Sequence, residues 1–126
     1  MKSKIAMAFE KCKKERRAAL ITYTVAGDNT KSNSLKILNT ISKHADILEL
    51  GFPHNTPIAD GGQIQGSSHR ALKNGIKLKD VFQIVKKCKN SNPGKPLIMM
   101  GYFNLIYHSG ENNFLKNCKA SGVDGL

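Results

Sequence analysis

Tryptophan is absent from this sequence, cysteine occurs only three times, and aromatic residues make up 6% of the 126 positions. The cysteines, Cys12, Cys88 and Cys118, are odd in number and far apart, which excludes a disulfide framework. There is no C-x-x-C motif and no histidine pair at the spacing of metal ligands. We therefore expect reduced, structural thiols, no bound metal and no cofactor.

Long hydrophobic runs are also missing, although 40% of the residues are hydrophobic. No apolar stretch approaches the roughly 20 residues that a membrane-spanning helix needs. The basic start, Met1 to Lys4, resembles that of a signal peptide, but the apolar stretch over residues 5–9 is too short for one. We expect a soluble, cytoplasmic protein that does not bind a membrane.

Acidic residues are scarce, since 9 of them face 20 lysines and arginines and leave a net charge of +11. Such a charge can indicate nucleic-acid binding. However, only Arg16, Arg17 and Arg70 are arginine, the residue that base and phosphate recognition favours, and the lysines are spread along the chain. A solvated surface explains them better, so no nucleic-acid partner is expected.

Apolar runs and helical periodicities alternate along the chain. Buried strands are expected at residues 18–26, 47–51 and 96–101, a fourth strand begins at residue 123, and helices are expected near residues 5–17, 33–41, 67–74, 81–88 and 111–120. Residues 52–66 form a long polar connection rich in proline and glycine, and long connections in compact domains are usually functional. No strands lie close enough to form a hairpin, so the pattern predicts parallel βαβ units.

The fold class that this order favours is α/β, of the TIM (β/α)8 barrel family. A nucleotide-binding fold is disfavoured because no G-x-G-x-x-G follows the first strand and no Walker loop is present. A whole barrel takes about 250 residues. Residues 1–126, with about three and a half β/α units, are therefore expected to form the N-terminal half of a single barrel domain.

Two carboxylates are the first candidates for chemistry. Glu49 lies near the C-terminal end of an otherwise apolar strand, where barrel enzymes carry catalytic residues, and desolvation there would raise its pKa. Asp60 follows in the long connection and can face the same barrel mouth, so the two could divide acid and base roles. Each also has a structural alternative, which is an ion pair for Glu49 and a turn for Asp60.

Several motifs, in order and at similar spacings, resemble the tryptophan synthase alpha chain family. They are Thr24 with Gly27-Asp28, Leu48-Glu49-Leu50-Gly51-Phe52-Pro53, Pro57-Ile58-Ala59-Asp60-Gly61, Ile64-Gln65, Arg70-Ala71-Leu72, Tyr102-Phe103-Asn104 and Gly122-Val123-Asp124-Gly125. The resemblance runs from about residue 15 to residue 126. It implies a (β/α)8 barrel and a lyase that breaks indole-3-glycerol phosphate into indole and glyceraldehyde 3-phosphate in tryptophan biosynthesis.

The resemblance also implies roles for individual residues. Glu49 would transfer protons in this retro-aldol cleavage, and Asp60 would accept a hydrogen bond from the indole N–H. Tyr23, Met100 and Tyr102 match positions that line the indole pocket, although packing in the core is an equally plausible role for each. The implied partner is a tryptophan synthase beta chain in an alpha2-beta2 heterotetramer.

Several departures from the family pattern fall in the long connection, and others are Asn29 in place of a usual proline and His44 in place of a usual glycine. Thr56 stands where relatives commonly have an aspartate that meets the beta chain, and His54 replaces a usual aromatic residue. The family's phosphate-binding glycines belong to the second half of the barrel, so these 126 residues are expected to be inactive alone. The alternative to a lyase is a non-catalytic half-barrel interaction module that binds a beta chain.

Overall fold

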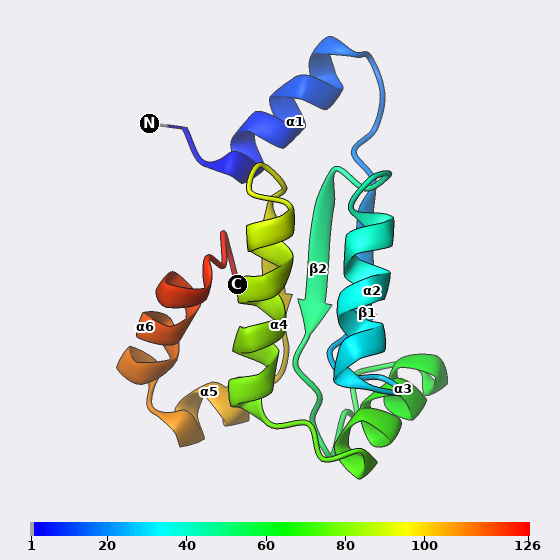
Figure 1. The fold of residues 1–126 in the computed structure, drawn as a ribbon, viewed down its shortest axis with the longest axis vertical. Helices are drawn as coiled ribbons and strands as arrows, with labels where there is room; N and C mark the ends of the chain where they lie inside the picture. The colour runs from blue at the N-terminus through cyan, green and yellow to red at the C-terminus, as the bar shows by residue number, and fades with distance from the viewer. Residues whose placement is uncertain (1) are drawn as a thin grey trace.

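The computed structural model describes residues 2–126, which form a small parallel sheet and the helices around it (Figure 1). The elements are α1 (Lys4–Lys14), β1 (Ile21–Val25), α2 (Lys31–Ile41), β2 (Ile47–Gly51), α3 (Gly62–Lys73), α4 (Leu78–Ser91), β3 (Leu97–Met100), α5 (Phe103–Ser109) and α6 (Glu111–Ser121). None of the described helices is both long enough and apolar enough to cross a membrane.

The sheet has the order β1-β2-β3, and both strand pairs are parallel, as the alternation of strands and helices predicts. The register aligns Tyr23 with Glu49, and Glu49 with Ile98. The expected fourth strand is reduced to a parallel bridge between Ile98 and Gly125, in which the Met99 N–H donates to the Gly125 carbonyl at 3.0 Å. The arrangement is three β/α units and the start of a fourth.

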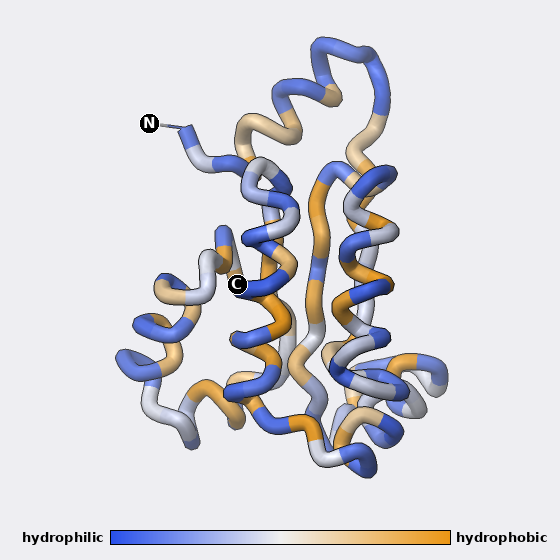
Figure 2. Tube along the Cα trace, viewed as in Figure 1, coloured by the Kyte–Doolittle hydropathy of each residue, from blue (hydrophilic) through white to orange (hydrophobic). Residues whose placement is uncertain are grey.

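Helices cover one face of this sheet. Leu48 and Leu50 of β2 and Leu97 and Met99 of β3 point to that face and are buried. Figure 2 shows hydrophobic segments along the central strand and along the neighbouring helices α2 and α4. The helices contribute Leu38 from α2, Val81, Ile84, Val85 and Cys88 from α4, and Phe114 and Cys118 from α6. Burial of these apolar side chains is the main favourable term in the stability of the fold.

The opposite face of the sheet is buried at its amino end, where Ile47 is 1% exposed, and is more open towards the carboxyl ends of the strands. Alternation along the strands directs Tyr23, Glu49 and Ile98 to it in one row. Two apolar residues of the same face, Ile21 and Met100, are 42% and 40% exposed. In a closed barrel this face would be the interior.

The first strand differs from its expectation of a long strand buried on both faces. It spans only Ile21–Val25, and Val25 is its one buried residue. The reason is its position at the edge of the described sheet. On the helix-facing side it carries Thr22 and Thr24, hydroxyl residues in place of the leucines of β2.

Helix starts were also mispredicted. Helix α2 begins at Lys31, and the residue that caps it is Thr30, whose side chain accepts a hydrogen bond from the Asn33 N–H. The expected capping residue was Asn33 or Ser34. Helix α3 begins at Gly62, five residues before the expected start, with no side-chain cap on Gly61. The seven-residue α5 was not expected at all.

A buried ion pair holds the start of the fourth strand. Lys89 of α4 donates to Asp124 at 2.5 Å and to the Lys95 carbonyl at 2.6 Å. Asp124 also accepts from the Leu97 N–H at 2.9 Å, which joins it to β3. Burial lowers the pKa of Lys89, and the hydrogen bond to Asp124 opposes that shift. The aspartate of the Gly-Val-Asp-Gly motif therefore ties the end of the chain to the helix layer.

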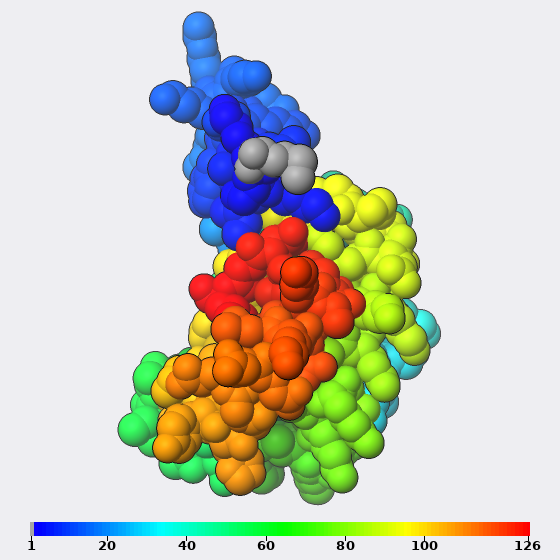
Figure 3. Space-filling view, turned by 90° about the vertical axis from the view of Figure 1, so that its left-hand side faces the viewer, coloured from blue at the N-terminus to red at the C-terminus, as the bar shows by residue number. Residues whose placement is uncertain are grey.

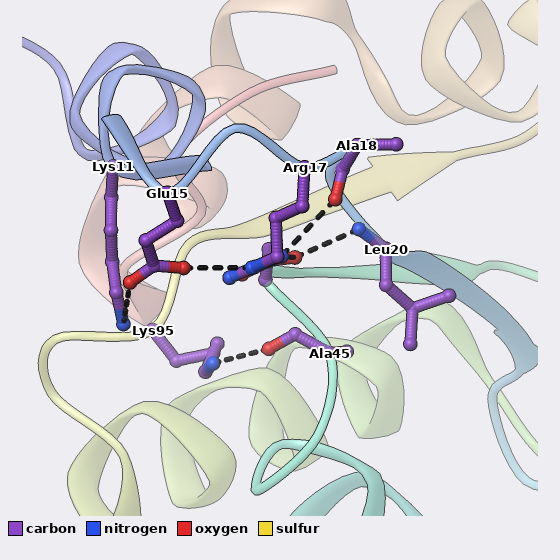
Figure 4. A network of polar contacts seen from close by, with 8 residues as sticks. Lys11, Glu15, Arg17, Ala18, Leu20, Ala45 and Lys95 are labelled. Atoms are coloured by element: carbon purple, nitrogen blue, oxygen red, sulfur yellow. Dashed lines mark hydrogen bonds and ion pairs between the residues drawn. The ribbon is translucent and has the colours of Figure 1, made fainter. Parts of the chain in front are cut away.

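A polar cluster ties the α1–β1 connection to β2 at the amino end of the sheet (Figure 4). Arg17 donates to both carboxylate oxygens of Asp46, at 2.6 and 2.8 Å, and to Glu15 at 2.7 Å. Asp46 also accepts from the Leu20 N–H at 2.8 Å. These bonds, with the one to Arg17 foremost, hold the pKa of Asp46 well below its usual range. Helix α1 projects beyond this cluster from the amino end of the sheet (Figure 3).

Asp46→Asn should lower the thermal midpoint by a few degrees near neutral pH, because the Arg17 fork loses its charged acceptor. A carboxylate whose pKa is lowered by folding contributes stability above its ordinary pKa of about 4, and this contribution is lost as the pH falls. The midpoint difference between parent and variant should therefore shrink in acid. Thermal unfolding, followed by circular dichroism over a pH series, measures this midpoint difference.

Glu15→Gln, which alters an exposed partner of the same arginine, is the control and should have the smaller effect on the midpoint. An Asp46→Asn difference that does not change with pH would contradict this account.

Candidate functional site

The candidate site lies at the carboxyl ends of the three strands. The connection from Phe52 to Gly61 leaves β2 there and leads into α3, while α5 follows β3 at the same edge (Figure 1). The Phe52 N–H donates to the Met100 carbonyl at 3.0 Å, which fixes the base of this connection to β3. The sheet and the connection together can therefore present side chains on one side of the molecule.

Glu49 is the only half-buried residue of β2, whose other four residues are buried. Its side chain belongs to the uncovered face, so the strand can hold a carboxylate that the helix-facing core could not accommodate. It borders a cavity of about 300 Å³, lined also by Phe52, Ile98, Met100 and Ile106. Glu49 makes no ion pair within residues 2–126.

Tyr23 lies beside Glu49 on β1 and covers the end of β2. A β-carbon built on Gly51 would lie 2.0 Å from the Tyr23 hydroxyl oxygen, so the ring can adopt this position only because residue 51 is glycine. The pKa of Tyr23 is raised to about 12, mainly by burial and in addition by the negative charges of Asp60 and Glu49. Both predicted carboxylates therefore act on the same phenol, although one belongs to a strand and the other to a connection.

Asp60 is held near the sheet by Tyr102, which follows β3. The Tyr102 hydroxyl accepts from the Ala59 N–H at 2.9 Å and donates to Asp60 Oδ2 at 3.4 Å. The Gln65 side chain donates to the Asp60 carbonyl at 2.8 Å. Asp60 is half-buried and thus retains access to solvent.

The three predicted pocket residues have different surroundings. Tyr23 is partly buried and packs against the core, as its structural alternative requires, yet its hydroxyl reaches over Gly51. Met100 is 40% exposed and borders the same cavity as Glu49, so it does not pack in the core. Tyr102 is half-buried and stacks on His54, with ring centroids 5.0 Å apart.

One contact near the site was not predicted. The Arg70 guanidinium of α3 donates to both oxygens of Asp28, at 2.7 and 2.8 Å, and thereby joins the connection after β1 to α3. This pairing lowers the pKa of Asp28. The two residues are 42 positions apart, and only their presence in the family motifs could have drawn attention to them.

Within residues 2–126, no group of three or more histidine, cysteine or acidic side chains is arranged to hold a metal ion. What the site does contain is one carboxylate on a strand, another on a connection and two phenols between them. Such an arrangement can transfer a proton from one group and stabilise a positive charge with the other. These groups stand at the edge of the sheet where barrel enzymes have their active sites.

The parallel β/α order and the position of the carboxylates define a protein of the (β/α)8-barrel class. The family model for the tryptophan synthase alpha chain matches residues 9–126. The chain therefore belongs to the tryptophan synthase alpha chain family.

Relatives and solved structures agree with this assignment. The tryptophan synthase alpha chain of Pelagibacter ubique is 66% identical over 124 residues, which are 98% of this chain and 47% of the relative. That of Pyrococcus furiosus is 47% identical over 108 residues, covering 86% of this chain and 43% of the relative. A solved structure from Aquifex aeolicus matches with a TM-score of 0.94 at 34% identity, over 99% of this chain and 50% of its own. The tryptophan synthase complex of Pyrococcus furiosus matches with a TM-score of 0.82 at 48% identity, over 85% of this chain and 44% of its own. The chain thus spans about half the length of the curated relatives it matches.

The raised pKa of Tyr23 leads to a prediction that links the two carboxylates. In the folded protein Tyr23 should ionise near pH 12, and Asp60→Asn should lower this pKa, because one of the two nearby negative charges is removed. The pKa should stay above the ordinary value of about 10, since burial is the main cause of the shift. A phenol whose pKa is raised by folding contributes stability that is lost as the pH rises above about 10.

The ultraviolet absorbance of tyrosinate, taken as the difference between the parent protein and the Tyr23→Phe variant, measures the ionisation of Tyr23. An unchanged Tyr23 pKa in Asp60→Asn would show that Asp60 does not face the phenol.

Proposed function

We propose that this chain provides the strand-borne proton-transfer group and the indole-binding carboxylate of a lyase that cleaves indole-3-glycerol phosphate to indole and glyceraldehyde 3-phosphate, in the biosynthesis of tryptophan. The observation that carries the proposal is the convergence of Glu49 and Asp60 on Tyr23 at the carboxyl edge of the sheet. The family assignment supports the choice of reaction.

We further propose that residues 1–126 form the N-terminal half of a single (β/α)8 barrel domain. The parallel sheet supports this reading, because helices cover one face while Ile21 and Met100 on the other are about 40% exposed. So does the match to half of the Aquifex aeolicus chain. In this proposal the far wall of the pocket and the phosphate site belong to the part of the barrel that the present chain does not cover.

The cleavage itself requires two proton movements and one charge to be stabilised. A proton must reach indole C3 as the bond from C3 to the side chain breaks, and the side-chain hydroxyl must lose its proton as it becomes the aldehyde. In our proposal Glu49 carries these protons, because its strand fixes it at the cavity. Asp60 accepts the hydrogen bond of the indole N–H and stabilises the positive charge that develops on the ring. Tyr23, Met100 and Tyr102 line the indole site.

A tryptophan synthase beta chain is the partner we propose. One of the solved structures that this chain resembles is described as the tryptophan synthase a2b2 complex of Pyrococcus furiosus. Phe103 and Tyr107, a pair of exposed aromatic residues with centroids 6.4 Å apart, lie at the same edge as the site and suit a protein contact. They also favour the second candidate function, a non-catalytic module that binds a beta chain. A cytoplasmic location is part of the proposal, supported by three free, buried cysteines.

The test uses a chimera in which this chain replaces the matching 124 residues of the Pelagibacter ubique relative, because a pocket needs both halves of a barrel. Glu49→Gln in this chimera keeps the size of the side chain but cannot transfer a proton. Turnover should fall by several orders of magnitude, since general acid–base catalysis contributes about 10²–10⁴-fold per transfer and Glu49 serves two. Substrate binding should change little. Indole release and the thermal midpoint are measured together.

Glu111→Gln, at an exposed glutamate of α6, is the matched control and should retain turnover. A folded Glu49→Gln chimera with near-normal turnover would remove Glu49 from the mechanism. A folded parent chimera that releases no indole would instead favour the interaction module.

A further inference from the structure

We propose that Tyr102 is a positioning residue, whose hydroxyl holds the connection that carries Asp60 against the sheet. This role goes beyond lining an indole pocket and rests on the function proposed for Asp60. Its evidence is the pair of hydrogen bonds that one phenolic oxygen makes to consecutive residues, Ala59 and Asp60, across about 40 positions of sequence.

Apart from Phe52 and Pro53, which are buried at its start, and the Gln65 side chain that donates to the Asp60 carbonyl at 2.8 Å, the connection has little else to hold it. Most of its residues beyond Pro53 are exposed, and Ile58, the largest apolar side chain in that part, is 82% exposed. Its backbone bonds at the tip are local, from the Ile58 N–H to the Thr56 carbonyl and from the Asp60 N–H to the Pro57 carbonyl. Local bonds of this kind shape a turn but do not fix it to the sheet. Segments with few buried contacts open at low free-energy cost.

The direction of the two hydrogen bonds follows from their chemistry. The Ala59 N–H can only donate, so the Tyr102 oxygen accepts at 2.9 Å. The single hydroxyl hydrogen is then free to point to Asp60 Oδ2, 3.4 Å away. A longer bond to Asp60 than to Ala59 leaves the carboxylate able to turn toward a ligand.

The ring of Tyr102 is itself held in place. It stacks on His54 at an interplanar angle of 30°, so the first and last parts of the connection both contact one side chain. Tyr102 is also the N-cap residue of α5. Its backbone is extended there, and its side chain makes no capping hydrogen bond to the helix. The phenol therefore bridges the end of β3 and both ends of the connection.

Tyr102→Phe in the chimera described above removes the hydroxyl but keeps the ring, its stacking and its contact with a pocket. We expect turnover to fall about 10- to 100-fold, because a misplacement of about 1 Å in a catalytic group can cost that much. The Michaelis constant should change by less than about threefold, since the aromatic lining remains. The amide of Ala59 should exchange with solvent at least about tenfold faster, because its acceptor is gone.

Glu111→Gln, at the exposed glutamate of α6 used above, is again the control. It should leave turnover and the exchange of Ala59 unchanged. Asp60→Asn should abolish turnover while leaving Ala59 protected, because the Ala59 bond does not use the carboxylate.

Amide exchange separates this proposal from the proposed function. If the Ala59 amide exchanges at the same rate in parent and Tyr102→Phe chimeras, the positioning role is wrong, whatever the activity. If exchange accelerates but turnover stays at the parent level, the hydroxyl holds the connection without serving Asp60, and the proposal is also overturned. If the parent chimera releases no indole, the proposed function fails, and the catalytic part of this proposal fails with it.

Discussion

The pairing of β2 with a parallel strand on each side is the interaction on which the rest of the structure depends. Being central, β2 uses its backbone donors and acceptors in both directions and aligns Tyr23, Glu49 and Ile98 in one row. A shift of one residue in either register would turn Glu49 into the helix-facing core and Leu50 out of it. The position of the candidate catalytic carboxylate is therefore fixed by the same contacts that fix the fold.

The two faces of the sheet divide stability and function between them. Apolar side chains from α2, α4 and α6 pack on one face, and the Arg17–Asp46 and Lys89–Asp124 pairs hold its amino end and its last segment. The other face and the carboxyl edge carry the half-buried polar groups. Two glycines allow close packing at this edge. The Tyr23 ring lies over Gly51, and the Phe52 ring occupies the space that a β-carbon on residue 101 would need. Aromatic rings thus approach the backbone at both strand ends.

Much of this fold could be predicted from the sequence, because strands with mostly buried residues, such as β2, leave short apolar runs bounded by turn residues. The polar face of β1 and its edge position gave a strand that was shorter and more exposed than expected. The start of α3 has no capping side chain, and α5 has only seven residues, so neither leaves a local signal. The roles predicted for Glu49 and Asp60 came from position and family motif. The contacts of Tyr102 with Ala59 and of Arg70 with Asp28 join distant residues, and no local pattern encodes them.

The central claim is that Glu49 stands on the most stable part of the fold, while Asp60 stands on a connection that must be held in place. Native-state hydrogen exchange of the β2 amides tests it most directly. The account predicts that the amides of Leu48 and Leu50, buried at the centre of the sheet, exchange only through global unfolding, far more slowly than those at the tip of the connection. Exchange of the β2 amides as fast as that of Ile58 would contradict it.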